Sequence, residues 1–240
     1  MPSASSMGGG DAGAGASGGI PSRIRAFIYD FDDTIVESER INAKLFGRLL
    51  GQSYGVVLSA AETDYLYGLS WTGVFDWLRT ARGLRPTRAE VWERFLQVKA
   101  ELLSRQTLHT ARGLSRMLAL PVPHVIVSGS TLPELRLVME NIGLAERHFR
   151  FIISDEDCAR GKPDPEGFQE ALRRLALPAA EVLVFEDSVP GLQAARAAGI
   201  PAAFVAEFAS GRGASIAEIS FPTLEDAWAA VKGRIGEGAM

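Results

Sequence analysis

Two aspartates near the start of the chain are the first residues whose type and spacing could do chemistry. Asp30 and Asp32 follow the apolar run 24–29, and side chains two positions apart share one face of a regular strand. At a strand end that turns into a loop, they can diverge to adjacent roles. The pair suits phosphoryl transfer, because one carboxylate can attack phosphorus while the other protonates the leaving oxygen and later deprotonates water. The alternative is that both merely end a strand at solvent.

A hydroxyl and a glycine end a second apolar run. Ser128 and Gly129 precede the start of a helix near Leu132. Free backbone amides and hydroxyls at such a point can bind phosphate oxygens. Ordinary turn chemistry explains the same residues equally well when they are taken alone.

A lysine and two further acids complete the set of candidates. Lys162 lies in a loop stiffened by Pro163 and Pro165, where a held ammonium could neutralise a phosphoryl oxygen or a carboxylate; otherwise it is a solvated surface lysine. Glu186 and Asp187 end another apolar run and suit Mg²⁺, bound directly or through water. Their alternative role is to cap a helix.

Strands must position these residues, and five apolar runs rich in β-branched and aromatic residues have strand length. They are 24–29, 124–127, 149–153, 182–185 and 202–205. Segments of helix length lie between them at 132–141, 165–176 and 190–198, with Pro near their starts and Gly beyond two of their ends. This alternation predicts an α/β fold in which a parallel, Rossmann-like sheet forms the middle of three layers.

The spacing of the candidates fits that sheet. Asp30, Ser128, Lys162 and Asp187 are separated by 98, 34 and 25 residues. Each stands just past a predicted strand, and the carboxyl ends of parallel strands meet at one edge, where ligands bind. The four positions are therefore predicted to converge.

The first crossover is too long for a simple connection. Residues 39–113 form a predicted helical insert, or cap, with apolar stripes at helical spacing. Thr87 and Glu90 fit a capping box, and Gly68, Gly73 and Gly83 are expected to break the insert into short helices. Hinges are expected near residues 37–40 and 109–114. The predicted catalytic core comprises residues 22–38 and 114–240.

The ordered motifs together resemble the haloacid dehalogenase superfamily of phosphohydrolases. They are Asp-x-Asp-x-Thr from Asp30, a hydrophobic residue followed by Ser128, Gly-Lys-Pro around Lys162, and Glu-Asp-Ser-x-x-Gly from Glu186. The insert and the last two motifs are most similar to the phosphoglycolate phosphatase and β-phosphoglucomutase group.

The resemblance implies a role for each residue. Asp30 is expected to be the nucleophile and a Mg²⁺ ligand, and Asp32 the general acid and base, which also lends its backbone carbonyl to the metal. Ser128, Gly129 and Lys162 are expected to bind the transferring phosphoryl group. Glu186 and Asp187 are expected to complete the Mg²⁺ site. The implied activity is hydrolysis of small phosphomonoester metabolites through an aspartyl phosphate.

Two rival functions remain open, a sugar-phosphate mutase and a catalytically idle binding protein. Thr34 favours a phosphatase, and Asp32 argues against haloacid dehalogenases proper. A mutase needs a second anion site, where the segment 66–71 places Tyr67 and Trp71 instead of basic residues, although Arg79 or Arg82 nearby could supply one. These two aromatic residues could contact the leaving group or belong to the core of the insert.

Composition limits the partners and the compartment. The chain has 240 residues, 29 acidic against 25 basic residues and a net charge of -4, which argues against nucleic acid or a membrane as a partner. A single cysteine, Cys158, and the absence of a long apolar run indicate a cytoplasmic protein. Residues 1–21 read as a disordered leader rich in Gly, Ala and Ser. His109, His124 and His148 are interpreted as non-catalytic.

Overall fold

A single parallel sheet of six strands organises the chain in the computed structural model, which describes residues 19–66, 71–209 and 212–236. The strands are β1 (Ala26–Tyr29), β2 (His124–Val127), β3 (Phe151–Ile153), β4 (Val182–Glu186), β5 (Ala202–Val205) and β6 (Ile219–Phe221). Their order is β3-β2-β1-β4-β5-β6, and every neighbouring pair is parallel. The chain therefore reverses its direction of growth between β1 and β4, where sheets of this kind bind ligands.

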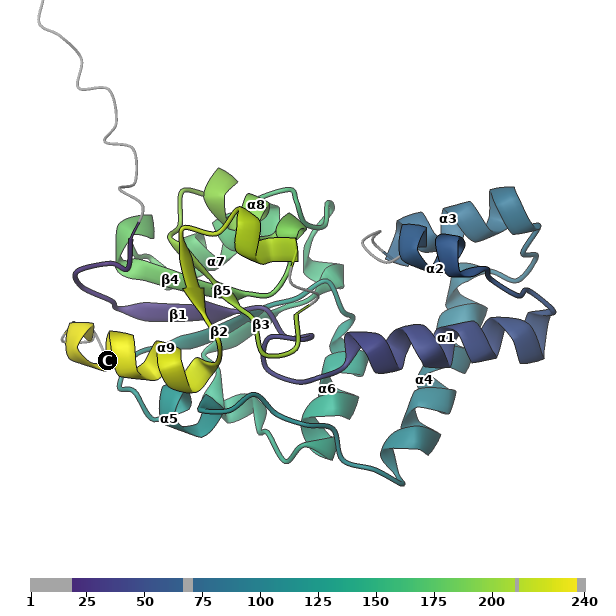
Figure 1. Ribbon diagram of the computed structural model, residues 1–240, viewed down its shortest axis with the longest axis horizontal. Coiled ribbons are helices and arrows are strands. Elements are labelled where there is room, and N and C mark those ends of the chain that lie inside the picture. Colours follow the sequence, from purple (N-terminus) through teal and green to yellow (C-terminus); the bar gives the residue numbers. More distant parts are fainter. Residues whose placement is uncertain (1–18, 67–70, 210–211, 237–240) are drawn as a thin grey trace, which may run out of the picture.

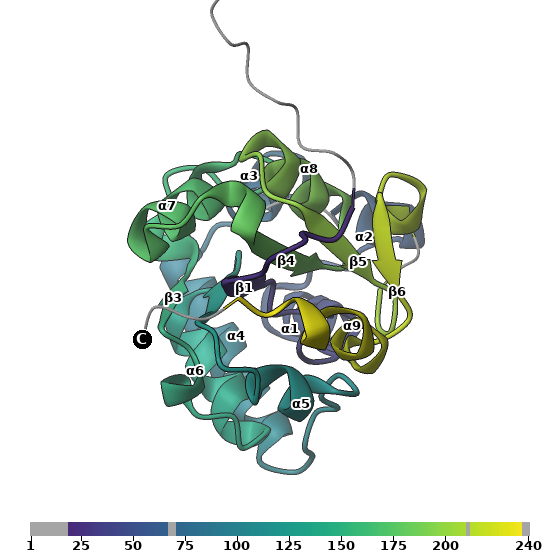
Figure 2. The same ribbon diagram turned by 90° about the vertical axis from the view of Figure 1, so that its left-hand side faces the viewer.

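Helices cover both faces of the sheet and make three layers, as the sequence predicts (Figure 2). They are α5 (Leu114–Leu118), α6 (Leu132–Asn141), α7 (Glu166–Leu175), α8 (Val189–Ala197) and α9 (Leu224–Val231). Alternate residues of β1 face opposite layers. Phe27 and Tyr29 join the core under α5, α6 and α9, whereas Ala26 and Ile28 join the core under α7 and α8.

Four further helices lie to one side of the sheet (Figure 1). They are α1 (Glu39–Tyr54), α2 (Ala60–Leu66), α3 (Trp71–Arg82) and α4 (Arg88–Leu103). They enclose an apolar core of their own, in which Leu49, Leu78 and Phe95 are almost completely buried. The capping box at the start of α4 is confirmed: the amide of Glu90 donates to Thr87 Oγ1, and the amide of Thr87 donates to Glu90 Oε2.

One predicted helix break is wrong. Helix α3 runs through Gly73, because burial of Val74, Phe75 and Leu78 outweighs the roughly 1 kcal/mol that glycine costs inside a helix. Gly83, with a φ of 65°, does end α3. Gly68 lies outside the described residues.

The two segments that link the insert to the sheet run side by side. Val36 and Thr110 form an antiparallel bridge, and the amide of Glu37 donates to the carbonyl of His109 at 2.9 Å. The amide of Ala111 donates to the carbonyl of Ile35 at 2.8 Å. The predicted hinges therefore meet in one short ladder, and the division of the chain into core and cap stays a prediction.

Within the described part of the chain, no helix is both long and apolar enough to cross a membrane. Of the predicted leader, only residues 19–21 are described.

Candidate active site

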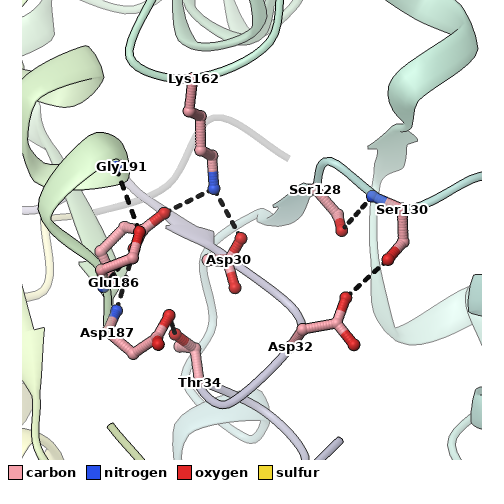
Figure 3. A network of polar contacts seen from close by, with 10 residues as sticks. Asp30, Asp32, Thr34, Ser128, Ser130, Lys162, Glu186, Asp187 and Gly191 are labelled. Atoms are coloured by element: carbon pink, nitrogen blue, oxygen red, sulfur yellow. Dashed lines mark hydrogen bonds and ion pairs between the residues drawn. The ribbon is translucent and has the colours of Figure 1, made fainter. Parts of the chain in front are cut away.

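Four chain segments bring polar side chains to the carboxyl edge of the sheet (Figure 3). Asp30 follows β1, Ser128 follows β2, and Glu186 is the last residue of β4. Lys162 reaches the same place from the loop between β3 and α7. The amide of Asp30 donates to the carbonyl of Phe185 at 2.9 Å, so the backbone pairing of β1 with β4 continues into the site. The predicted convergence is present.

Lys162 joins two carboxylates. Its Nζ lies 2.5 Å from Asp30 Oδ1 and 2.5 Å from Glu186 Oε1, and the side chains of Lys162, Asp30 and Glu186 are 15%, 11% and 0% exposed. Burial alone would lower the pKa of Lys162, but the two carboxylates outweigh it and raise that pKa above its ordinary value. The lysine is therefore a fixed cation at the site.

Asp30 lies in a strongly negative environment. Burial raises the pKa of its carboxyl well above the ordinary value; Lys162 opposes that rise, and Glu186 and Asp32 add to it. The one ammonium bound to Asp30 thus compensates only part of the local charge.

Glu186 uses both carboxylate oxygens within the protein. Its Oε1 accepts from Lys162, and its Oε2 accepts from the backbone amides of Asp187 and Ser188 at 2.9 Å each. A Cβ at Gly191 would lie 1.7 Å from Glu186 Oε1, so only glycine leaves room for this carboxylate against the start of α8. In this arrangement Glu186 holds Lys162 and the loop that carries Asp187.

Asp32 points away from Asp30 (Figure 3). Its Oδ1 accepts from the hydroxyl of Ser38 at 2.5 Å, and its Oδ2 accepts from the hydroxyl of Ser130 at 2.7 Å. Sequence reasoning assigned no role to Ser38 or Ser130. Ser130 could have been found from its place in the Ser-Gly-Ser loop, whereas no signal in the sequence points to Ser38.

Ser128 lies between Asp30 and Ser130 in Figure 3. Its Oγ accepts from the backbone amide of Ser130 at 3.0 Å, which fixes the turn. Ser128, Gly129 and Lys162 line a small hollow that continues under the loop 158–164. The Ser128 hydroxyl and the Lys162 ammonium are groups that suit an anionic ligand.

Asp187, like Asp30, is a carboxylate of the site whose pKa is raised. Burial raises its pKa well above the ordinary value, with further rises caused by Glu186 and Asp30. The hydroxyl of Thr34 donates to Asp187 Oδ1 over a long 3.4 Å. Asp30 and Asp187 therefore repel each other across the site unless a cation lies near both.

The donor set fits Mg²⁺. No three His, Cys, Asp or Glu side chains of the described segments form a ready-made metal cluster. Mg²⁺ is usually held by one or two carboxylates, with waters and substrate phosphate completing its shell. Asp30 and Asp187 are two such carboxylates, and their mutual repulsion is what a divalent cation would relieve.

The surroundings of His124, Cys158 and Trp71 favour a structural role over a catalytic one. The ring nitrogens of His124 are 3.1 Å from the hydroxyl of Tyr29 and 3.1 Å from the carbonyl of Leu120. Burial raises the pKa of the Cys158 thiol, which disfavours a thiolate. Trp71 packs on aromatic rings of the insert, and Tyr67 lies outside the described residues.

Comparison with known proteins decides the family. The family model of the haloacid dehalogenase-like hydrolases matches residues 27–205, which include all the motifs above. The chain belongs to the haloacid dehalogenase-like hydrolases. The resemblance inferred from the sequence is thereby confirmed, and the chain is a hydrolase of this family.

Individual relatives of this hydrolase are distant. Protein CbbY of Rhodobacter capsulatus is 26% identical over 226 residues, which cover 85% of this chain and 95% of that protein. The phosphoglycolate phosphatase of Pectobacterium atrosepticum is 28% identical over 183 residues, covering 73% and 77%. The crystal structure of CbbY from Rhodobacter sphaeroides in complex with phosphate superposes with a TM-score of 0.73 at 19% identity, covering 85% of this chain and 96% of that one. This likeness confirms the predicted fold class.

Proposed function

We propose that this hydrolase is a Mg²⁺-dependent phosphatase of small phosphomonoester metabolites and that it works through an aspartyl phosphate at Asp30. One observation carries the proposal: Asp30 is bound to Lys162 at the carboxyl edge of the sheet, beside Ser128 and opposite Asp187. A carboxylate alone would repel a phosphate dianion, and a cation fixed next to it allows the approach. The phosphatase named among the relatives supports this reading.

In the first half of the reaction, a carboxylate oxygen of Asp30 attacks phosphorus while the bond from phosphorus to the leaving oxygen breaks. Asp32 gives its proton to that leaving oxygen. Lys162 and the Ser128 hydroxyl bind the oxygens of the phosphoryl group while negative charge moves from Asp30 toward the leaving oxygen.

In the second half, Asp32 takes a proton from a water molecule, and the water oxygen attacks phosphorus. The bond between Asp30 and phosphorus breaks, which releases inorganic phosphate and restores the carboxylate. The same residue thus serves first as acid and then as base.

Asp30, Asp187 and the carbonyl of Asp32 would hold the Mg²⁺, and Glu186 would act on them through Lys162 and the Asp187 loop or through water. When bound, the metal supplies positive charge that offsets the repulsion between carboxylates and phosphate. The predicted cap, residues 39–113, would close over the substrate and exclude bulk water. A single half-buried cysteine agrees with the predicted cytoplasmic location.

The test is turnover of p-nitrophenyl phosphate with and without Mg²⁺, in the wild type and in Asp30→Asn. We expect metal-dependent release of phosphate that falls roughly a thousandfold or more in Asp30→Asn, since the nucleophile is lost. Asp76→Asn, an exposed aspartate of α3, is the matched control and should leave turnover unchanged. Failure of the wild type to hydrolyse any member of a broad phosphometabolite panel contradicts the proposal.

A second assay separates hydrolysis from group transfer within a sugar. Incubation with β-glucose 1-phosphate and a bisphosphate primer should release free phosphate. Formation of the 6-phosphate without free phosphate would indicate a mutase instead.

A further inference from the structure

A fully buried ion pair joins the helical insert to the sheet domain. Lys99 of α4 and Glu134 of α6 place Nζ and Oε1 2.6 Å apart, with side chains 0% and 1% exposed. Lys99 lies on the buried face of α4, between Phe95 in the apolar core of the insert and Leu103 in the core under α5, α6 and α9. The pair therefore occupies the junction of the two cores.

Stability alone does not explain this pair. Two charges taken from water lose hydration that their attraction rarely restores in full, and well-packed apolar residues often serve as well. Glu134 Oε2, moreover, has no hydrogen-bonding partner among the described residues. Burial raises the pKa of Glu134, and Lys99 opposes that rise. A role in fixing the position of a neighbour accounts better for such an arrangement.

The neighbour is Ser130. Glu134 lies in the first turn of α6, and Ser130 stands two residues before that helix begins at Leu132. The hydroxyl of Ser130 has a single hydrogen, which it gives to Asp32 Oδ2 at 2.7 Å. The start of α6, which the Lys99–Glu134 ion pair holds, therefore directly follows the hydroxyl that binds Asp32.

The other end of the junction is fixed independently. The side-chain amide of Asn141, the last residue of α6, donates to the carbonyls of Leu103 and Gln106, and its Oδ1 accepts from the amide of Leu108. The start of α6 is held by Lys99, so α4 and α6 are joined at two separated points. Loss of the ion pair alone should therefore disturb the start of α6 without detaching α4.

We propose that Lys99 and Glu134 are positioning residues, which act through Ser130 to hold Asp32 in the orientation needed to protonate the leaving oxygen. This inference rests on the proposed phosphatase function and adds two residues to its machinery. Neither residue needs to touch the substrate, because the start of α6 transmits the effect.

The test uses the leaving group to distinguish positioning from general structural damage. An alkoxide needs a proton to leave, whereas p-nitrophenolate is a stable anion that leaves without one. Values of kcat/KM, which report the first irreversible step, would be measured for p-nitrophenyl phosphate and for two alkyl phosphates, phosphoglycolate and glycerol 3-phosphate. The variants are Glu134→Gln, Lys99→Met and the double variant, with Arg136→Gln as the control that breaks an exposed ion pair on the same helix.

The ratio of alkyl to aryl kcat/KM should fall about tenfold in each single variant, a fraction of the range of general acid catalysis, and no further in the double variant. Arg136→Gln should keep the wild-type ratio. Equal losses for both substrate types would show a merely structural role and overturn the proposal. If the buried variants fail to fold, Ser130→Ala decides: the same fall supports the inference, and an unchanged ratio refutes it. Absence of any wild-type turnover would instead refute the proposed function.

Discussion

Gly191 shows how one residue without a side chain can shape the site. Glu186 occupies the space in which a Cβ would stand, so Gly191→Ala must push that carboxylate away from Lys162. We expect a loss of about 1–3 kcal/mol in the free energy of unfolding, as for other overpacked sites, together with a fall in kcat. Denaturant unfolding and turnover of p-nitrophenyl phosphate measure the two effects.

Gly47, in α1, provides the matched control for that substitution. A Cβ there meets nothing within 4 Å, so Gly47→Ala should leave kcat unchanged and raise stability slightly through helix propensity. Equal behaviour of the two alanine variants would contradict the packing argument.

The buried carboxyl of Asp33 should make the free energy of unfolding depend on pH. Its Oδ1 accepts from the amides of Ser38 and Glu39 at 2.9 and 3.1 Å, and its φ is 54°. Burial raises its pKa from 3.8 to about 6, so the folded state holds this proton more tightly than the unfolded state does. The contribution that Asp33 makes to the free energy of unfolding is therefore fully present below pH 3.8, and it is lost as the pH rises through about 6.

Asp33→Asn keeps an acceptor oxygen and tolerates a positive φ but does not titrate. Relative to the wild type, its melting temperature should therefore increase as the pH is raised from 4 to 7, as followed by circular dichroism in EDTA. A constant difference between the two proteins over that range would show that Asp33 does not titrate there.

At this scale the sequence revealed which residues converge but not how their side chains turn. Asp30, Ser128 and Lys162 were predictable because each follows a strand or its loop in an ordered set of motifs. The hydroxyls that hold Asp32 depend on the direction its side chain takes after the strand ends. Lys99 and Glu134 are 35 residues apart, and no local pattern links them.

At the scale of elements, Trp71 decides between two interpretations of an aromatic residue in the insert. Its ring lies 5.0 Å from that of Phe46, 4.7 Å from that of Trp92 and 5.4 Å from that of Phe95, between centroids. These contacts connect α3 with α1 and α4 and favour the core interpretation. Trp71→Ala should therefore lower the free energy of unfolding by about 3 kcal/mol.

Tyr65, which is 59% exposed in α2, is the comparison residue, and Tyr65→Ala should change stability by less than about 0.5 kcal/mol. Urea unfolding of both variants tests the difference. A stable Trp71→Ala protein with a strongly raised KM would assign Trp71 to the substrate instead.

Elements were predicted well where the local signal was strong. Helix α6 begins and ends at the predicted residues, since Pro133 stands near its start and Gly143 follows its end. Strand β6 was not predicted, because three residues with an exposed Ser220 in the middle give too short a pattern. The helix break predicted at Gly73 was wrong because tertiary packing outweighs the weak preference of glycine against a helix interior.

For the whole molecule, the excess of acidic over basic residues is explained in part by the acidic residues of the candidate active site. Part of it is concentrated at the site, where Lys162 pairs with Asp30 and Glu186, and where Glu186 and Asp30 help burial to raise the pKa of Asp187. A ligand that binds the folded state alone raises stability, by about 2.7 kcal/mol at a hundred times its Kd. Mg²⁺ should therefore raise the melting temperature of the wild type by several degrees.

Asp187→Asn tests that expectation without any activity measurement. The variant should melt at a higher temperature than the wild type in EDTA, because a repulsive charge is gone, and it should lose most of the response to Mg²⁺. The same Mg²⁺-induced shift in both proteins would place the metal elsewhere.

In the proposed mechanism, Asp30 carries the phosphoryl group between the two halves of the reaction. Acid quenching of the wild type during turnover, followed by peptide mass spectrometry, tests it most directly. We predict a phosphoryl group on Asp30 in the wild type and none in Asp30→Asn. Turnover without phosphorylation of Asp30, or with phosphorylation of another residue, would refute the aspartyl phosphate at Asp30.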